Sequence, residues 1–260
     1  MKTRVVLGCV VAGLLGAGAC AYGGDLTHPT PPLREAGPDL DGRDLYLRDC
    51  AWCHAADGEG TTRGPDLVTG SNGPAFTHFM LTTGRMPIAD PAQRTRRRPR
   101  VYSEQEIAEI VEYVSSFGAI GPDIPSVQVA AGHIGEGLEL YQENCAACHA
   151  PTLVGGALTE SSAAGSTSLI APDLREASPT EIAEAMLVGP GSMPVFGTDT
   201  FTEQQVDSMV AYVVAQQDPD DQGGAPIGRV GPVAEGAVAW LVGLAATLVL
   251  IRWIGTKVES

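Results

Sequence analysis

The sequence predicts an all-α protein with two tandem helical domains, a C-terminal transmembrane helix and a possible N-terminal one. Three patterns carry this prediction. The segment GRDLYLRDCAWCHA at 42–55 recurs as GLELYQENCAACHA at 137–150, which marks an internal repeat. An amphipathic helical pattern closes each copy, and residues 233–254 are apolar except for Glu235 and Arg252. The length of 260 residues suits two domains of this kind.

Proline-rich and apolar stretches divide the chain further. In order, we expect a signal peptide or retained membrane anchor (1–24), a Pro-rich linker (25–41), a first domain (42–120), a linker (121–132), a second domain (133–217), a linker (218–232), a transmembrane helix (233–254) and a cytoplasmic tail (255–260).

Each predicted domain begins and ends with a helix. The first helix of each copy places a Leu-Tyr pair, at 45–46 and 140–141, on its buried side. The last helix starts with a capping box, Ser-x-x-Glu at 103–106 or Thr-x-x-Gln at 202–205, and apolar residues follow at helical spacing. The two copies therefore share their first and last elements.

Each copy also contains the motif Cys-x-x-Cys-His. Its residues are Cys50, Cys53 and His54 in the first copy and Cys145, Cys148 and His149 in the second. This motif attaches c-type haem through two thioethers, and its histidine is the proximal iron ligand. A thioredoxin-like redox pair or half of a zinc site would also use two such cysteines. A zinc site needs a second ligand pair nearby, and no further Cys pair follows at short spacing, so we expect two covalently bound haem c groups.

The sixth ligand of each iron is predicted to be a methionine. Met86 and Met193 each precede a proline in a Gly-x-Met-Pro loop just before the last helix. A residue before proline avoids helical dihedral angles, so each methionine is held extended. A thioether stabilises ferrous iron and gives the high-potential arrangement of cytochromes c. Upstream of these loops both copies also carry Pro-Asp-Leu, at 65–67 and 172–174.

Three other side chains could compete for the sixth position. Met80 and Met186 fall in expected helices, where methionine more often fills the core, and His78 has no counterpart in the second copy. With both irons six-coordinate, no site remains open for oxygen or peroxide chemistry. The pattern therefore favours an electron carrier with no catalytic residues over a dihaem peroxidase.

Both ends of the chain suggest a membrane. Acidic residues precede the apolar stretch 233–254, whereas Arg252 and Lys257 lie at its far end, so the positive-inside rule places the C-terminus in the cytoplasm. At the N-terminus, Lys2 and Arg4 precede an uncharged run that ends near Cys20. This run is a cleaved signal peptide, with or without a lipid on Cys20, or a retained span. Every alternative exports the haem domains to the outer side of the plasma membrane.

Charge is unevenly distributed. Residues 121–228 contain fifteen acidic side chains and one basic side chain, Arg175, whereas residues 25–120 contain fourteen acidic residues and ten arginines. The second domain could therefore attract a basic partner electrostatically. The alternative interpretation is that its acidic surface only keeps the protein soluble. Five arginines crowd residues 94–100, where they could pair with haem propionates, lipid headgroups or an acidic subunit. Nucleic acid is not an expected partner on the exported side.

Two tandem Cys-x-x-Cys-His domains, the Thr-Gly-Arg-Met-Pro loop at 83–87 and the approach to the C-terminal span at 231–243 together resemble the dihaem cytochrome c subunit (cytochrome cc) of the actinobacterial cytochrome bc complex, a menaquinol-cytochrome c reductase. The resemblance implies class I cytochrome c domains, with the cysteines, histidines and Gly-x-Met-Pro methionines named above as haem ligands. It also implies cytochrome b and Rieske iron–sulfur subunits as partners, and an aa-type oxidase as electron acceptor. The chain would then be an enzyme only as an electron-transfer subunit of a translocase.

One further alternative is a dihaem carrier of another respiratory complex, such as a cbb-type oxidase. That subunit is usually anchored from its N-terminal side, whereas this chain has its clearest span after the haem motifs. The resemblance also suggests an order, in which the first haem accepts electrons from the Rieske protein and the second donates them to the oxidase.

Overall fold

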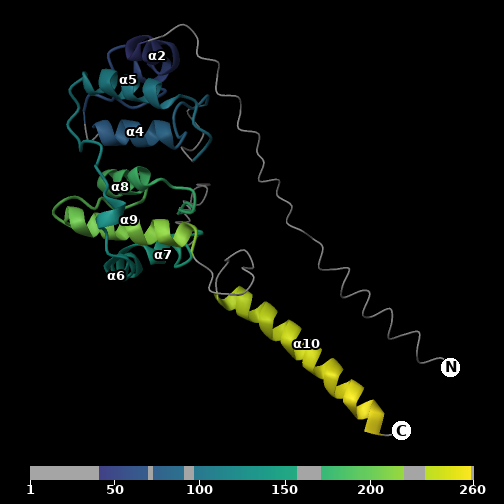
Figure 1. Cartoon of the computed structure of the whole chain (residues 1–260). Coiled ribbons are helices and arrows are strands. Elements are labelled where there is room, and N and C mark those ends of the chain that lie inside the picture. The colour runs from purple at the N-terminus through teal and green to yellow at the C-terminus, as the bar shows by residue number, and fades with distance from the viewer. Residues whose placement is uncertain (1–40, 70–72, 91–96, 157–170, 220–231, 259–260) are drawn as a thin grey trace. The chain divides into compact units, whose positions relative to one another are not determined.

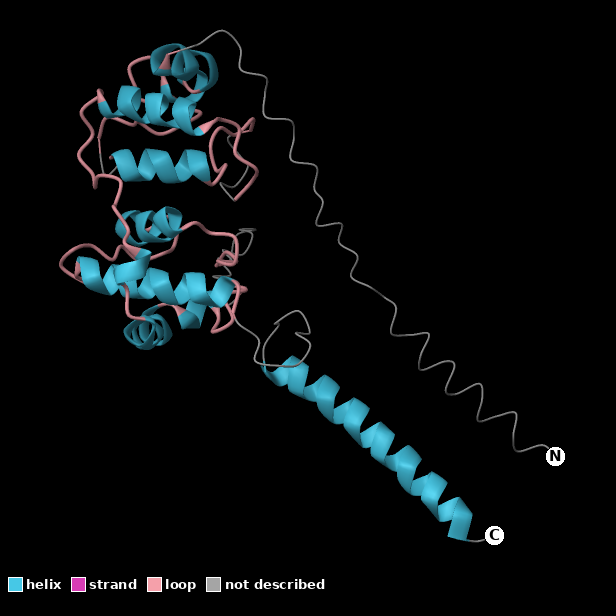
Figure 2. Cartoon of the chain, viewed as in Figure 1, coloured by secondary structure: helices cyan, strands magenta, loops and turns pink. Residues whose placement is uncertain are grey.

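The structure is a computed structural model of the chain, and it describes residues 41–69, 73–90, 97–156, 171–219 and 232–258. These residues form helices joined by loops, with no β-strand beyond an isolated bridge between Thr61 and Gly64 (Figure 2). The all-α prediction is confirmed. The predicted signal peptide or anchor, and the Pro-rich linker apart from Asp41, lie outside the described residues.

The first copy of the repeat folds around its last helix (Figure 1). Its helices are α2 (Gly42–Asp49), α3 (Ala51–His54), α4 (Pro74–Thr82) and α5 (Glu104–Ser115). Both α2 and α4 pack against α5. Tyr46 of α2 and Ile107 and Ile110 of α5 are almost fully buried in the shared core. The Leu-Tyr pair and the apolar face of α5 thus have the burial that their spacing predicts.

The second copy repeats this arrangement. Its helices are α6 (Ile134–Asn144), α7 (Ala146–His149), α8 (Pro179–Val188) and α9 (Glu203–Gln217), and a 3₁₀ turn, η2 (Val129–Ala131), precedes them in the predicted linker. Both α6 and α8 pack against α9, as their equivalents α2 and α4 do against α5. Tyr141, Met209 and Val210 lie at the centre of the core. Both copies belong to a single compact unit, Leu40–Ser260.

One glycine in each copy lets the first and last helices of that copy cross closely. A Cβ atom added to Gly42 would lie 2.0 Å from the carbonyl oxygen of Glu109, and one added to Gly137 would lie 1.9 Å from that of Ser208. Atoms cannot approach this closely, so the crossing requires a residue without a side chain. The repeat of Gly42 as Gly137 therefore reflects the crossing of α2 with α5 and of α6 with α9.

Side-chain caps fix where the last helices begin. Both predicted capping boxes are confirmed: Ser103 pairs reciprocally with Glu106 at the start of α5, and Thr202 with Gln205 at the start of α9. A third box, Ser178 with Glu181, starts α8 and was not predicted from the sequence. Each box satisfies backbone N–H groups that would otherwise lack partners at the helix N-terminus.

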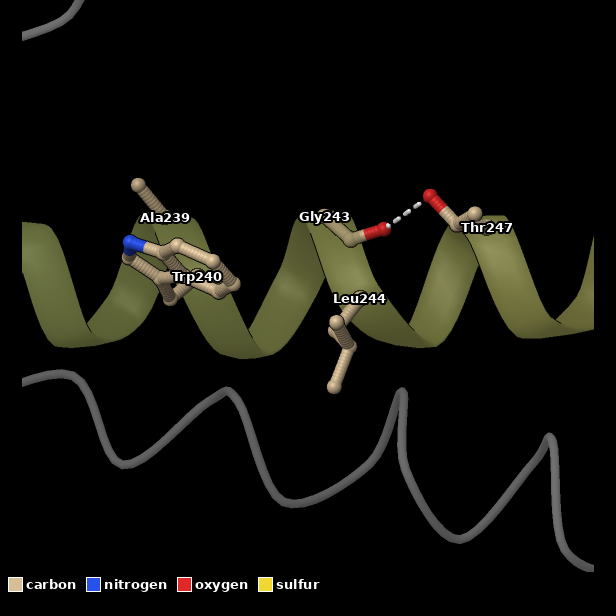
Figure 3. Close-up of a pocket in the computed structure, with 5 residues that line it drawn as sticks. All are labelled: Ala239, Trp240, Gly243, Leu244 and Thr247. Carbon is tan, nitrogen blue, oxygen red and sulfur yellow. Dashed lines mark hydrogen bonds between the residues drawn. The ribbon is translucent and has the colours of Figure 1, made fainter.

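The C-terminal helix α10 (Pro232–Val258) is long and apolar enough to cross a membrane over Gly236–Gly255, where its mean hydropathy is 2.0. None of that segment is buried against the rest of the protein. A shallow hollow on α10 is lined by Ala239, Trp240, Gly243, Leu244 and Thr247 (Figure 3). The Thr247 hydroxyl donates to the carbonyl oxygen of Gly243 at 2.8 Å, so this polar group is satisfied within the helix.

Candidate haem sites

The two Cys-x-x-Cys-His motifs fold alike. Each first cysteine ends one helix and starts the short next one, with nearly the same backbone angles: φ −116° and ψ −37° at Cys50, φ −117° and ψ −37° at Cys145. The four-residue helices α3 and α7 then place the second cysteine and the histidine on one turn. The structure therefore brings the three motif residues of each copy together.

A proline carbonyl orients each motif histidine. His54 Nδ1 lies 2.8 Å from the carbonyl oxygen of Pro65, and His149 Nδ1 lies 3.1 Å from that of Pro172. A carbonyl can only accept, so Nδ1 carries the proton and Nε2 is left with a free lone pair. This is the arrangement by which a protein orients a metal-binding imidazole. Burial also lowers the pKa of His149, which favours the neutral ring.

The Pro-Asp-Leu segments are recognisable in the sequence as a repeat, but the role of their prolines is not. The signal was their recurrence at matching places in the two copies. Their function could not be inferred because the segments lie 11 and 23 residues from the histidines that their carbonyls contact. Only the fold shows that both loops return to the motif helix.

A tyrosine supports the residue after each histidine. Ala55 has φ 62° and Ala150 has φ 61°, a conformation that residues with a side chain seldom adopt. The Tyr46 hydroxyl donates to the carbonyl oxygen of Ala55, and the Tyr141 hydroxyl to that of Ala150, both at 2.8 Å. These buried tyrosines of the Leu-Tyr pairs thus hold the turn that follows each motif.

The four motif cysteines are free thiols that are partly buried. Burial raises the pKa of Cys50 to about 12 and that of Cys145 to about 11. A thioredoxin-like pair instead needs a thiol with a lowered pKa. Within the described residues there is also no cluster of three or more His, Cys, Asp or Glu side chains that could hold a metal ion. The raised pKa values argue against a thioredoxin-like redox pair, and the lack of a ligand cluster in this part of the chain argues against a zinc site.

The two Gly-x-Met-Pro methionines occupy corresponding places. Met86 and Met193 are partly buried, and each packs against the core of its own domain. The Met86 N–H donates to the carbonyl oxygen of Met80, and the Met193 N–H to that of Pro190. Each methionine is therefore held by its loop at the border of the core that its motif helix also borders.

Two of the three competing side chains make other contacts. Met186 is buried in the second core, with 4% of its surface exposed. His78 Nδ1 lies 2.5 Å from Glu184 Oε1 of the second domain. An imidazole held in that contact points its Nδ1 atom at α8 of the other copy. Arg94 and Arg96 lie outside the described residues, whereas Arg97 and Arg100 each form an ion pair.

Comparisons with known proteins agree with the duplication. The family described as "Cytochrome c" matches residues 40–118, and that described as "Cytochrome C oxidase, cbb3-type, subunit III" matches residues 132–213. A "Cytochrome bc1 complex cytochrome c subunit" of Corynebacterium diphtheriae is 34% identical over 95% of this chain and 92% of its own length. The chain belongs to this family. The subunit of the same name in Mycobacterium bovis is 33% identical over 88% of this chain and 83% of its own.

A cytochrome c subunit of the bc1 complex transfers electrons and binds haem c, and the complex is a quinol-cytochrome c oxidoreductase. The motif residues of this subunit fit that group: each copy offers two thiols that form no disulfide within the described residues, and an imidazole whose Nε2 has no hydrogen-bond partner there. A "Cbb3-type cytochrome c oxidase subunit CcoP" of Azospirillum is 28% identical over 52% of the chain and 46% of its own length. That likeness is lower and covers less of both proteins.

Proposed function

We propose that the chain is a membrane-anchored dihaem electron carrier. Cys50, Cys53, Cys145 and Cys148 bind two haem c groups, His54 and His149 are the proximal ligands, and Met86 and Met193 are the distal ligands. The observation that carries this proposal is the duplicated contact between a motif histidine and a proline carbonyl, at 2.8 Å and 3.1 Å. It prepares one Nε2 atom in each domain for iron.

When bound, each haem supplies a one-electron ferrous–ferric couple. The chain's own residues set the conditions for that couple. The carbonyl of Pro65 or Pro172 fixes the imidazole tautomer and ring orientation. The thioether of Met86 or Met193 would be the second protein ligand of each iron and would favour the ferrous state. Two strong ligands on each iron leave the chain with electron transfer and no bond-making chemistry.

The proposed route begins at menaquinol. Electrons pass through the Rieske cluster to the first haem, then to the second, and then to an aa-type oxidase. The partners are thus the cytochrome b and Rieske subunits and the oxidase. The family membership and the apolar segment Gly236–Gly255 support this placement at the plasma membrane. The haem domains face the extracytoplasmic side, and Arg252 lies at the cytoplasmic end of α10, as the positive-inside rule requires.

A dihaem carrier of a cbb-type oxidase is the second candidate. The match of residues 132–213 to a cbb3-type subunit favours it, but that match covers the second domain alone. The bc1 relatives match almost the whole chain.

Purification of the native complex separates the two candidates. The chain, tagged at its C-terminus, is extracted from membranes in mild detergent, and its partners are identified by mass spectrometry. We expect cytochrome b and Rieske subunits in stoichiometric amounts, together with an aa-type oxidase. Recovery with a cbb-type catalytic subunit and without cytochrome b would contradict the proposal.

A further inference from the structure

Helices from equivalent places in the two copies contact each other. α4 and α8 each lie between the haem motif and the Gly-x-Met-Pro loop of their domain, and they pack together. His78 on α4 and Glu184 on α8 approach to 2.5 Å, between Nδ1 and Oε1. The two residues are not equivalent by the repeat, so this contact is a specific addition to it.

A second contact comes from the arginine-rich segment of the first domain. Arg97 Nη1 donates to Glu181 Oε2 at 3.0 Å, and Arg97 Nη2 donates to the carbonyl oxygen of Glu176 at 3.0 Å. Glu181 also accepts from the Ser178 N–H in the capping box of α8. The guanidinium therefore binds a side chain in the first turn of α8 and a backbone carbonyl in the loop just before that helix. An acidic partner for this arginine lies within the same chain.

Glu184 makes separation of the helices costly. Its side chain is 0% exposed, and its Oε2 atom has no hydrogen-bond partner among the described residues. A buried carboxylate needs a positive partner, and His78 supplies it. Burial raises the pKa of Glu184, and the hydrogen bond with Glu184 raises the pKa of His78. Each of the two groups therefore releases its proton at a higher pH in this contact than it would in water.

Other charges face the same contact. Glu104 of α5 and Glu181 of α8 also favour the protonated form of His78, and Glu181 disfavours ionisation of Glu184. Arg85, next to Met86, is partly buried, and Glu181 and Arg97 act on it. Positive groups of the first domain thus meet acidic groups at the start of α8.

We propose that His78, Arg97, Glu181 and Glu184 form an inter-domain latch that holds the two haem domains in one arrangement and thereby sets the rate of electron transfer between the haems. This inference rests on the proposed function, since the rate requires a haem in each domain. Electron tunnelling slows steeply as the separation of donor and acceptor grows. A loosened latch would therefore slow the internal step without altering either haem ligand set.

The test uses the full-length holoprotein in detergent. Three variants are compared: Arg97→Gln, Glu184→Gln and the double variant. The matched control is Arg100→Gln, because Arg100 belongs to the same arginine run but pairs with Glu104 of its own domain, at 2.7 Å. Hydrogen exchange of backbone amides in α4 and α8 reports on the contact. Flash reduction of one haem, followed optically, gives the rate of electron transfer to the other.

We expect exchange in α8 to quicken about threefold in Arg97→Gln, the scale of a partly exposed ion pair. In Glu184→Gln it quickens about tenfold or more, because a buried pair loses one charge. The rate between haems falls in both and falls furthest in the double variant, while Arg100→Gln matches the wild type. Unchanged exchange in the double variant would overturn the proposal, as would faster exchange with an unchanged rate between haems.

A pH series provides an independent measurement on the wild type. The hydrogen bond with Glu184 raises the pKa of His78 above its ordinary 6.5, so the contribution of His78 to the latch is lost as the pH rises through the raised value. Toward acid pH, protonation of Glu184, whose pKa burial raises, removes the other charge of the pair. The rate between haems should fall as the pH rises through the raised pKa of His78 in the wild type and stay flat in Glu184→Gln; equal pH profiles would also overturn the proposal. Haem content and partner recovery in the same preparations test the proposed function separately.

Discussion

The Nδ1 atom of each motif histidine meets a proline carbonyl, and each neighbouring tyrosine hydroxyl holds the alanine carbonyl that follows. Both contacts are present in both copies. Together they fix the imidazole tautomer and the turn after the motif. Residues outside the Cys-x-x-Cys-His motif therefore help to prepare each site.

Loss of the tyrosine hydroxyl should destabilise the first domain. Tyr46→Phe leaves the carbonyl oxygen of Ala55 without its donor at a partly buried site, and we expect a loss of about 1 to 2 kcal/mol in the free energy of unfolding. Tyr113→Phe is the matched control, because Tyr113 packs against Tyr46 but its hydroxyl makes no hydrogen bond in the described part of the chain. Denaturant unfolding of the holoprotein measures both. Equal effects of the two variants would argue against the role of the hydroxyl.

Exchange of a distal ligand should move one reduction potential alone. In Met86→His an imidazole replaces the thioether that favours ferrous iron, so the potential of the first haem should fall by a sizeable part of the roughly 0.8 V range that axial ligands span. The second haem should keep its potential. Met80→Leu is the control and should change neither. A redox titration followed optically makes the measurement, and a shift in Met80→Leu would assign the ligand to Met80 instead.

At the scale of elements, the helix pairs α2 with α5 and α6 with α9 carry each domain. Their patterns were readable from the sequence because apolar spacing and capping boxes are local signals. The glycine crossings, the proline carbonyls and the His78–Glu184 contact were not readable. Each depends on segments brought together by the fold, and His78 and Glu184 are 106 residues apart. The third capping box, at Ser178, was a local signal that was overlooked.

The glycine at a helix crossing gives a clear test within one helix. Gly137→Ala would place a Cβ atom 1.9 Å from the carbonyl oxygen of Ser208, so α6 must shift away from α9. We expect a loss of about 1 to 3 kcal/mol in unfolding free energy, the usual range for overpacking. Gly135→Ala, in the same helix with nothing within 4 Å of its added Cβ atom, should be neutral or stabilising by up to about 1 kcal/mol. Thermal unfolding measures the stability of both variants. A Gly135→Ala variant less stable than Gly137→Ala would contradict this prediction.

Over the whole molecule, the two tandem domains and their linkers differ in net charge. The second half, residues 121–228, carries fifteen acidic side chains against one basic side chain. Part of this acidity is used internally, since Glu181 and Glu184 meet Arg97 and His78. Asp173 also pairs with Arg175, and the net negative charge that remains would attract a basic partner over a distance.

Electron delivery to the oxidase should therefore depend on salt. Raising the ionic strength from about 10 mM to about 1 M shortens the Debye length from roughly 30 Å to roughly 3 Å, so a second-order rate between the purified chain and the oxidase should fall by about tenfold or more. Electron transfer between the two haems, measured in the same samples, should change little. A rate of delivery that does not vary with salt would remove acidic steering from the account.

In the proposed function each copy of the repeat binds its own haem. The pyridine haemochrome assay and intact-protein mass spectrometry, applied to the purified chain, count covalent haems directly. We expect two haems in the wild type, one in the Cys50→Ala/Cys53→Ala variant and one in the Cys145→Ala/Cys148→Ala variant. A single haem in the wild type, or two haems in either variant, would contradict it.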